Sequence, residues 1–126
     1  MIKEIKTNKA PQVVGPYSQA IEVDNFIFCS GQISVDPATG EIAGENIKEQ
    51  TERVIENLKI VLSEAGSSLS QVVKTEVYLS DMNNFVEMNK IYAEKFAQQP
   101  YPARATIEVA RLPKDVLVEI SCIAHK

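Results

Sequence analysis

The sequence has no tryptophan and little histidine or cysteine: His125 is its single histidine, and Cys29 and Cys122 are its only cysteines. Neither cysteine belongs to a Cys-x-x-Cys pair, and each lies in an apolar run. We therefore expect two reduced, buried thiols in a cytoplasmic protein rather than a disulfide or a catalytic cysteine. No ligand spacing for a metal occurs, so we expect no metal site. A Ser-His-Asp triad would need the penultimate residue, at a terminus that frays.

Basic charge is also scarce. Lysine and arginine number 13 against 17 acidic residues, which gives a net charge of -4. Such a chain lacks the positive field that nucleic acids and anionic lipid surfaces favour, so we expect neither as a partner. No apolar run approaches the roughly 20 residues of a membrane span. The charged residues 1–6 do not form the apolar core of a secretory signal, and the glycines form no phosphate-binding pattern.

What the sequence does contain fits one globular domain over residues 1–126. Hydrophobic residues make up 44% and charged residues 24%, the balance of an ordinary folded domain. Surface scaling predicts that about two-thirds of the extended chain's surface becomes buried. No repeat, low-complexity segment or linker interrupts the chain. We therefore expect a substantial core without disulfide or metal staples.

Apolar periodicity predicts two helices. The first begins at the cap Asn46, has Glu49 in a capping-box position, and ends at Gly66. The second begins at residue 83 or 84 and ends by Gln98, before a proline-rich segment.

Alternating apolar residues predict five strands, which give the order β-β-α-β-α-β-β. This order indicates an α+β fold in which both helices pack on one face of a mixed sheet. Valine and isoleucine occur on both faces of the last strand, and no further helix can cover the second face. Self-association in a ring is the economical way to bury that face. The predicted strands span 20–23, 26–30, 72–80, 104–109 and 116–124.

Arg104 and Glu119 are the first two candidates for chemistry. Arg104 follows Pro102-Ala103 at a strand start, where a fixed guanidinium can hold a planar carboxylate in two-point geometry. Its alternative role is a surface or intersubunit ion pair. Glu119 lies on a mostly apolar strand, where burial raises the pKa of a carboxyl and suits it to acid–base work. A structural ion pair with Arg104 or Arg111 is the alternative.

Three further segments are candidates for lining a cleft. Tyr17 sits in a loop stiffened by proline, which suits aiming a phenol into a cavity, although it could equally cap the core. Ser30-Gly31 ends a strand where the backbone can approach a ligand closely, or simply turns the chain. Asn89, on the second helix, could donate its amide to a ligand or be an ordinary polar flank.

Several longer stretches fix the interpretation when taken together. They are Gly15-Pro16-Tyr17-Ser18-Gln19-Ala20, Ser30-Gly31-Gln32-Ile33, Pro102-Ala103-Arg104, Glu108-Val109-Ala110-Arg111-Leu112-Pro113-Lys114-Asp115 and Val118-Glu119-Ile120. Over nearly the whole chain, these stretches resemble the RidA (YjgF-like) family of reactive-intermediate deaminases. The resemblance implies a chorismate-mutase-like α+β fold and a homotrimer with clefts between subunits, in agreement with the uncovered sheet face.

The resemblance also implies roles for individual residues. Arg104 matches the arginine that binds the substrate carboxylate, and Glu119 matches the glutamate that places and activates water. Tyr17, Ser30 and Asn89 match cleft-lining positions, and Gly31 supplies backbone near the ligand. The chain departs from the family at Thr106, where cysteine is common, so any binding role there falls to the hydroxyl or the backbone. It departs again at Ser121, where relatives often carry a second glutamate.

The implied reaction is hydrolytic deamination of 2-aminoacrylate-like enamines and their imines, such as those of pyruvate and 2-oxobutyrate, to 2-oxo acids and ammonia. No cofactor is implied, because the imine is already activated. A different class of function stays open: a non-catalytic regulatory trimer that binds small carboxylates. Translation inhibition and RNA cleavage, also linked to this family, are disfavoured by the acidic charge.

Overall fold

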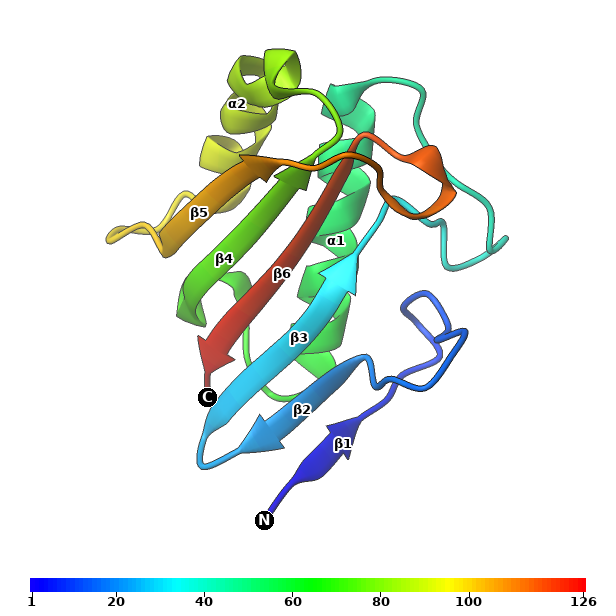
Figure 1. Cartoon of the computed structure of the whole chain (residues 1–126). Helices are drawn as coiled ribbons and strands as arrows, with labels where there is room; N and C mark the ends of the chain where they lie inside the picture. The colour runs from blue at the N-terminus through cyan, green and yellow to red at the C-terminus, as the bar shows by residue number, and fades with distance from the viewer.

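A six-stranded mixed sheet with two helices on one face makes up the molecule (Figure 1). The computed structural model describes all of residues 1–126. The strands are β1 (Lys3–Ile5), β2 (Ala20–Val23), β3 (Phe26–Gln32), β4 (Val72–Leu79), β5 (Ala103–Glu108) and β6 (Val118–His125), and the helices are α1 (Ile47–Glu64) and α2 (Phe85–Lys95).

The strand order across the sheet is β1-β2-β3-β6-β4-β5. Only β4 and β5 run parallel, joined through α2, and every other neighbouring pair is antiparallel. The predicted fold class is confirmed, with one correction: β1 was not predicted from the sequence. This strand has only three residues, of which Ile5 alone is buried, so it leaves no alternation to detect.

The bounds of α1 follow the predicted signals. The Asn46 side chain accepts a hydrogen bond of 2.9 Å from the backbone N–H of Glu49, and Gly66 follows the helix in a left-handed conformation with φ of +80°. The predicted end of α2 at Gln98 is wrong, since the helix stops at Lys95. Phe96 turns into the core, where it is 3% exposed, and its backbone leaves the helical region.

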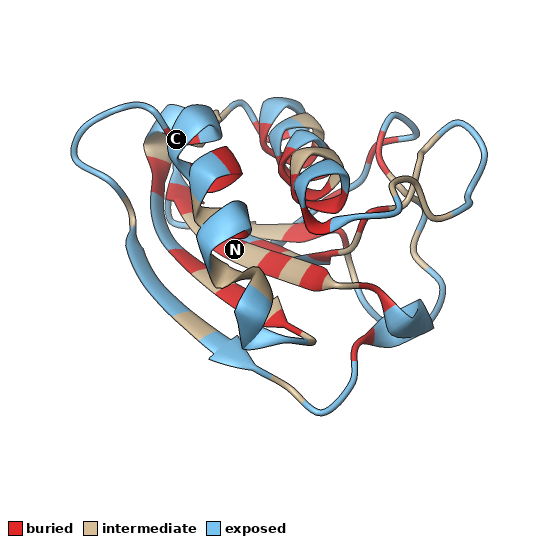
Figure 2. Cartoon of the chain, turned by 90° about the horizontal axis from the view of Figure 1, so that it is seen from above, coloured by how far each residue is buried: buried red, intermediate tan, exposed pale blue.

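The core lies between the helices and the sheet, where buried residues of both layers face each other (Figure 2). On β4, Thr75, Val77 and Leu79 are buried, whereas a register shift between Val72 and Lys74 leaves Val73 42% exposed. Cys29 and Cys122 lie directly opposite each other on β3 and β6, free and buried as expected. The Cys29 thiol and burial together raise the pKa of Cys122.

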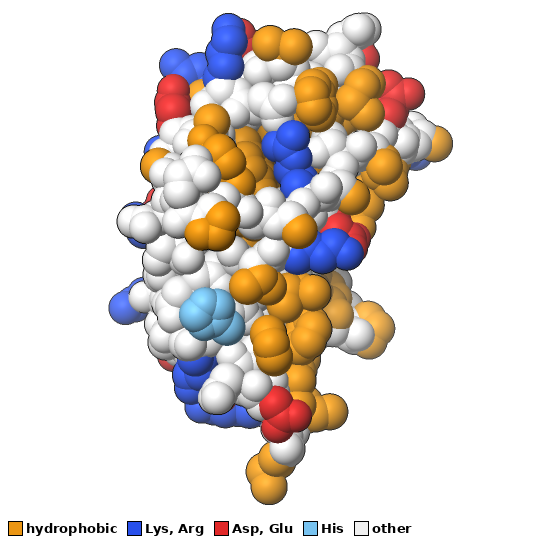
Figure 3. Space-filling model, turned by 90° about the vertical axis from the view of Figure 1, so that its left-hand side faces the viewer, with side chains coloured by type: hydrophobic (Ala, Val, Ile, Leu, Met, Phe, Trp, Pro, Cys, Tyr) orange, Lys and Arg blue, Asp and Glu red, His pale blue; other side chains and the backbone are white.

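The opposite face of the sheet has no covering layer, and apolar side chains lie on it. Phe28 of β3 and Ile107 of β5 are 42% and 50% exposed. Figure 3 shows hydrophobic side chains gathered down the side of the molecule where this face lies. The charged residues Lys74 and Glu76 on this face pair with each other, with 3.5 Å between the ammonium and the carboxylate. The hydroxyl of Tyr78 also donates a hydrogen bond of 2.5 Å to Glu76. We call this surface the uncovered face.

No helix in the structure combines the length and the apolar character needed to cross a membrane. No group of three or more histidine, cysteine or acidic side chains is arranged to hold a metal ion.

Candidate functional site

Arg104 extends from β5 toward α2, on the helix side of the sheet. Its Nη1 donates a hydrogen bond of 2.7 Å to Oδ1 of Asn89. Its guanidinium carbon also lies 4.7 Å from the ring centroid of Tyr92 and 5.6 Å from that of Phe85, within cation–π range. Arg104 belongs to no salt bridge, so the predicted surface ion pair does not form within the chain. An exposed guanidinium is thus held in place with donors still free for an anion.

Tyr92 connects this guanidinium to the core. Its hydroxyl shares a buried hydrogen bond of 2.7 Å with Oγ1 of Thr75 on β4, and its ring packs 4.5 Å from that of Phe96. Burial raises the pKa of Tyr92 and so keeps the phenol neutral. Helical spacing alone gives no sign of this contact, because Arg104 lies on another element. Tyr92 and Asn89 therefore act as supports for Arg104.

Thr106 lies two residues beyond Arg104 on the same strand, so its side chain points to the same side of the sheet. Its Oγ1 is buried and has no hydrogen-bond partner in the chain. A buried hydroxyl without a partner carries a free-energy penalty that a bound polar group can relieve. Thr106 thus has an unused hydroxyl on the same side of the sheet as Arg104, two residues further along the strand.

Glu119 extends from β6 on the uncovered face. The carboxyl is half-buried, and burial raises its pKa above the usual range. It belongs to no salt bridge, so the predicted alternative of an ion pair with Arg104 or Arg111 is wrong within the chain. Arg111 instead pairs with Asp115 through two bonds of 2.6 and 3.0 Å. Glu119 is therefore a lone carboxyl whose charge is disfavoured, as an acid–base group near neutral pH requires.

Gly31 makes room for this carboxyl. The register between β3 and β6 shifts between Cys29 and Gln32, so Gly31 lies in a β-bulge, a feature enriched next to active sites. A Cβ on Gly31 would contact the carboxylate of Glu119 directly and lie 2.8 Å from its Cδ. The sequence predicted a close approach of a ligand to this glycine, and the close approach within the chain is made by Glu119.

Ser30 and Gln19 fix the loop that carries Tyr17. The hydroxyl of Ser30 donates to the carbonyl of Ser18 at 2.6 Å, and its backbone N–H donates to the carbonyl of Gln19 at 3.0 Å. The buried carboxamide of Gln19 bonds both backbone groups of Thr7, at 2.7 and 3.1 Å. Tyr17 is 53% exposed and, with Gly31, lines a cavity of about 490 Å³. Nothing in the sequence pattern marks Gln19 as the anchor, because its partners are backbone groups distant in sequence.

The predicted residues thus fall into two groups on opposite faces of the sheet. Arg104 pairs in register with Thr75, which is buried under the helices, whereas Glu119 pairs with Tyr78 on the uncovered face. Arg104, Asn89 and Thr106 form one group, and Glu119, Gly31, Ser30 and Tyr17 form the other. A single copy of the chain does not bring Arg104 and Glu119 together.

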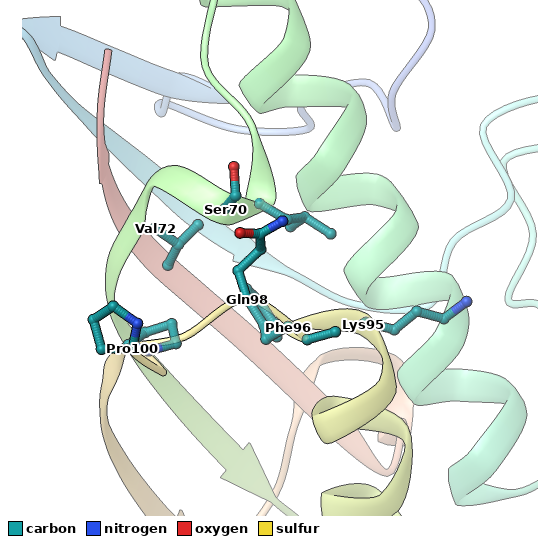
Figure 4. Close-up of a pocket in the computed structure, with 9 residues that line it drawn as sticks. Ser70, Val72, Lys95, Phe96, Gln98 and Pro100 are labelled. Atoms are coloured by element: carbon teal, nitrogen blue, oxygen red, sulfur yellow. The ribbon is translucent and has the colours of Figure 1, made fainter.

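A separate small pocket lies away from both groups. Figure 4 shows it between the end of α2, represented by Lys95 and Phe96, and the segment around Pro100. Its volume is about 20 Å³, which accommodates about one water molecule. None of the predicted site residues lines it, and we assign it no functional role.

Comparison with known proteins gives consistent relationships. Residues 7–126 match the family described as Endoribonuclease L-PSP. A RutC family protein of Pyrococcus abyssi is 60% identical over 127 residues, covering 100% of this chain and 99% of the relative. The chloroplastic Reactive Intermediate Deaminase A of Arabidopsis thaliana is 44% identical over 95% of this chain and 64% of its own length. The crystal structure of Escherichia coli TdcF with bound serine matches with a TM-score of 0.94 at 40% identity, covering 98% of both chains.

Proposed function

The chain belongs to the Endoribonuclease L-PSP (YjgF/RidA) family, which includes reactive-intermediate deaminases, and from this premise we propose that it deaminates reactive imines. The substrates are 2-aminoacrylate-like enamines and their imine tautomers, and the products are a 2-oxo acid and ammonia. The observation that carries the proposal is Arg104, which is held on three sides and has no anionic partner in the chain.

The working form is a homotrimer with one cleft at each subunit boundary. In each cleft, Arg104 of one copy faces Glu119 of its neighbour. Two observations support this arrangement: the two residues lie on opposite faces of one sheet, and the uncovered face carries apolar side chains. Large exposed apolar patches mark interaction sites, and closed rings are a common way to bury them.

Arg104 binds the substrate carboxylate. Its free N–H groups donate two parallel hydrogen bonds, which fix the plane of the conjugated imino acid. Asn89 and Tyr92 limit the movement of the guanidinium, so little ordering entropy is lost when the substrate binds. The hydroxyl of Thr106 is placed to accept or donate one further hydrogen bond. These residues act mainly by positioning the substrate, and a misplacement of about 1 Å can lower the rate about a hundredfold.

Glu119 acts on water. Its carboxylate takes a proton from a water molecule as the oxygen attacks C2 of the imine, and it passes that proton to the imine nitrogen to give a carbinolamine. Glu119 then takes the hydroxyl proton of the carbinolamine and delivers it to the same nitrogen, so that the C=O bond forms as ammonia leaves. Each water thus supplies the ketone oxygen, and the C–N bond is the one that breaks. The raised pKa of Glu119 suits both steps, and the catalytic rate should rise with pH as this carboxyl ionises.

The test is a coupled assay in which a serine or threonine dehydratase generates the imine and release of the 2-oxo acid is followed. We expect Arg104→Ala to lose about a hundredfold in kcat/KM, and Arg104→Lys to recover little because a single ammonium cannot replace the planar fork. Lys95→Ala, at an exposed lysine on the same side of the sheet, is the matched control. Full activity in Arg104→Ala would contradict the carboxylate assignment.

The same assay separates the alternatives. A regulatory trimer that only binds small carboxylates would bind pyruvate stoichiometrically, with Arg104 dependence but no accelerated turnover. A ribonuclease would cleave RNA added to the reaction. We expect no cleavage, because the net charge is -4 and the only histidine, His125, lies at the end of β6 with its Nδ1 against the carbonyl of Lys126.

A further inference from the structure

The cavity beside Gly31 and Tyr17 is larger than the smallest proposed substrates need. Its volume is about 490 Å³, and its walls come from residues 11–19, residues 31–40 and the pair Pro113 and Lys114. Pockets of about 300–1,000 Å³ hold drug-sized ligands, whereas 2-aminoacrylate has only a three-carbon skeleton. Because Gly31 borders this cavity and also contacts Glu119, the cavity adjoins the carboxyl that would act on the imine.

One charged side chain lines this cavity. Lys114 is exposed and forms no salt bridge, and no acidic residue is among the lining residues. Figure 1 shows its segment, between β5 and β6, next to the loop that follows β3. The other lining residues are apolar or neutral and polar, so Lys114 is the one charge among them that an anionic group would meet.

The backbone holds Lys114 in an uncommon conformation. Lys114 and Asp115 have φ of 55° and 56°, two successive non-glycine residues in the left-handed region. Each such residue costs free energy and persists where its surroundings enforce it, often at functional sites. Here the two bonds from Arg111 to Asp115 and the buried Leu112 and Val116 on either side fix the turn. The buried residues on either side therefore hold the turn that carries Lys114 against the domain.

We propose that this cavity is the side-chain subsite of the deaminase and that Lys114 selects 2-imino acids whose side chain ends in a carboxylate. This inference rests on the proposed function, since it assigns the substrate class of the same site. The carboxylate on C1 is held by Arg104 of a neighbouring copy, and the distal carboxylate lies at Lys114. The preferred substrates are then imines of 2-oxo dicarboxylic acids.

The experiment compares imines generated in place by amino-acid oxidases acting on glutamate, norvaline and 2-aminobutyrate. We expect the glutamate-derived imine to be hydrolysed with at least tenfold higher kcat/KM than the norvaline-derived one, which has a similar length and no distal charge. Lys114→Met should remove this preference, whereas Lys48→Met, at an exposed lysine of α1 outside the cavity, should keep it and leave the 2-aminobutyrate-derived imine within twofold. Lys114→Arg keeps the charge and should keep the preference, which also controls for the strained backbone.

A direct binding measurement distinguishes failure of the subsite proposal from failure of the deaminase proposal. Calorimetric titration of 2-oxoglutarate against 2-oxopentanoate reports the subsite without any turnover. If short imines are accelerated but neither assay shows a Lys114-dependent preference, the subsite is wrong and the deaminase stands. If no imine is accelerated while 2-oxoglutarate still binds more tightly in a Lys114-dependent way, the deaminase is wrong and the cavity is a dicarboxylate site. Equal effects of Lys114→Met on both ligands would overturn the subsite.

Discussion

At the scale of single residues, the sequence predicts chemical types better than contacts. Glu119 stands out because a charged side chain on an apolar strand is unusual, and Arg104 stands out because it follows Pro102-Ala103 at a strand start. The surroundings that give them their properties come from distant positions: Asn89 lies 15 residues from Arg104, and Gly31 lies far along the chain from Glu119. The bulge that places Gly31 depends on the register of two strands, which no local pattern records.

Gly31→Ala is expected to act on Glu119 alone. The new Cβ would overlap the carboxylate, which is the far end of a flexible side chain, so the carboxylate moves and the backbone does not. We expect kcat/KM to fall about tenfold or more, because misplacement of an acid–base group is costly in rate. The free energy of unfolding, measured by urea denaturation, should change by less than about 1 kcal/mol.

The double variant Gly31→Ala/Glu119→Gln is the control for this prediction. If the glycine acts only through the carboxylate, the second substitution should make the first almost silent in rate. Additive losses in the two variants would show that Gly31 has an independent role, for example a backbone contact with the substrate.

At the scale of elements, capping and alternation are the signals that worked. Asn46 and Gly66 bound α1 because their side-chain and backbone chemistry is local. The predicted end of α2 was wrong because tertiary burial of Phe96 overrides helix propensity. Strand β1 was not predicted because three residues are too few to show a periodicity. Buried polar side chains such as Gln50, whose Oε1 accepts from the backbone of Leu117, join α1 to the residue that precedes β6 and could not be predicted from spacing.

The hydrogen bond between Tyr92 of α2 and Thr75 of β4 gives the prediction for these elements. Tyr92→Phe keeps the ring beside Arg104 but leaves the fully buried hydroxyl of Thr75 without its partner. We expect a stability loss of about 1–3 kcal/mol with kcat unchanged. Tyr92→Leu also removes the ring, and KM should then rise about tenfold while kcat changes less, since the cation–π contact orients the substrate clamp.

Thr75→Val/Tyr92→Phe is the matched control. Because it removes both hydroxyls, no buried polar group is left without a partner, and much of the stability should return. Thermal unfolding and the split between KM and kcat are the two measurements. A fall in kcat without a change in KM in Tyr92→Leu would argue against an orienting role.

At the scale of the whole molecule, the uncovered face and the divided site have one explanation. The sequence predicted the face correctly, because two amphipathic helices can cover only one side of a sheet. The family resemblance implied clefts between subunits, and the positions of Arg104 and Glu119 on opposite faces of the sheet are compatible with such a cleft. The order and handedness of copies around a ring are beyond any pattern in one chain.

Mixing two inactive variants tests this arrangement. Arg104→Ala and Glu119→Gln should each be inactive alone, but equal amounts unfolded and refolded together should form mixed trimers. A cleft is active when a copy with Arg104 precedes a copy with Glu119, which happens in about a quarter of clefts if the copies assort randomly around a closed ring. We therefore expect about a quarter of the wild-type deaminase activity in the coupled assay, whereas refolding each variant separately before mixing should give none.

The control mixture combines wild type with a chain that carries both substitutions. After refolding together, about a quarter of the activity should remain if clefts are shared, and about half if each copy is self-sufficient. Recovery near zero in the first mixture, together with one-half in the second, would place the whole site within one copy and contradict the shared cleft.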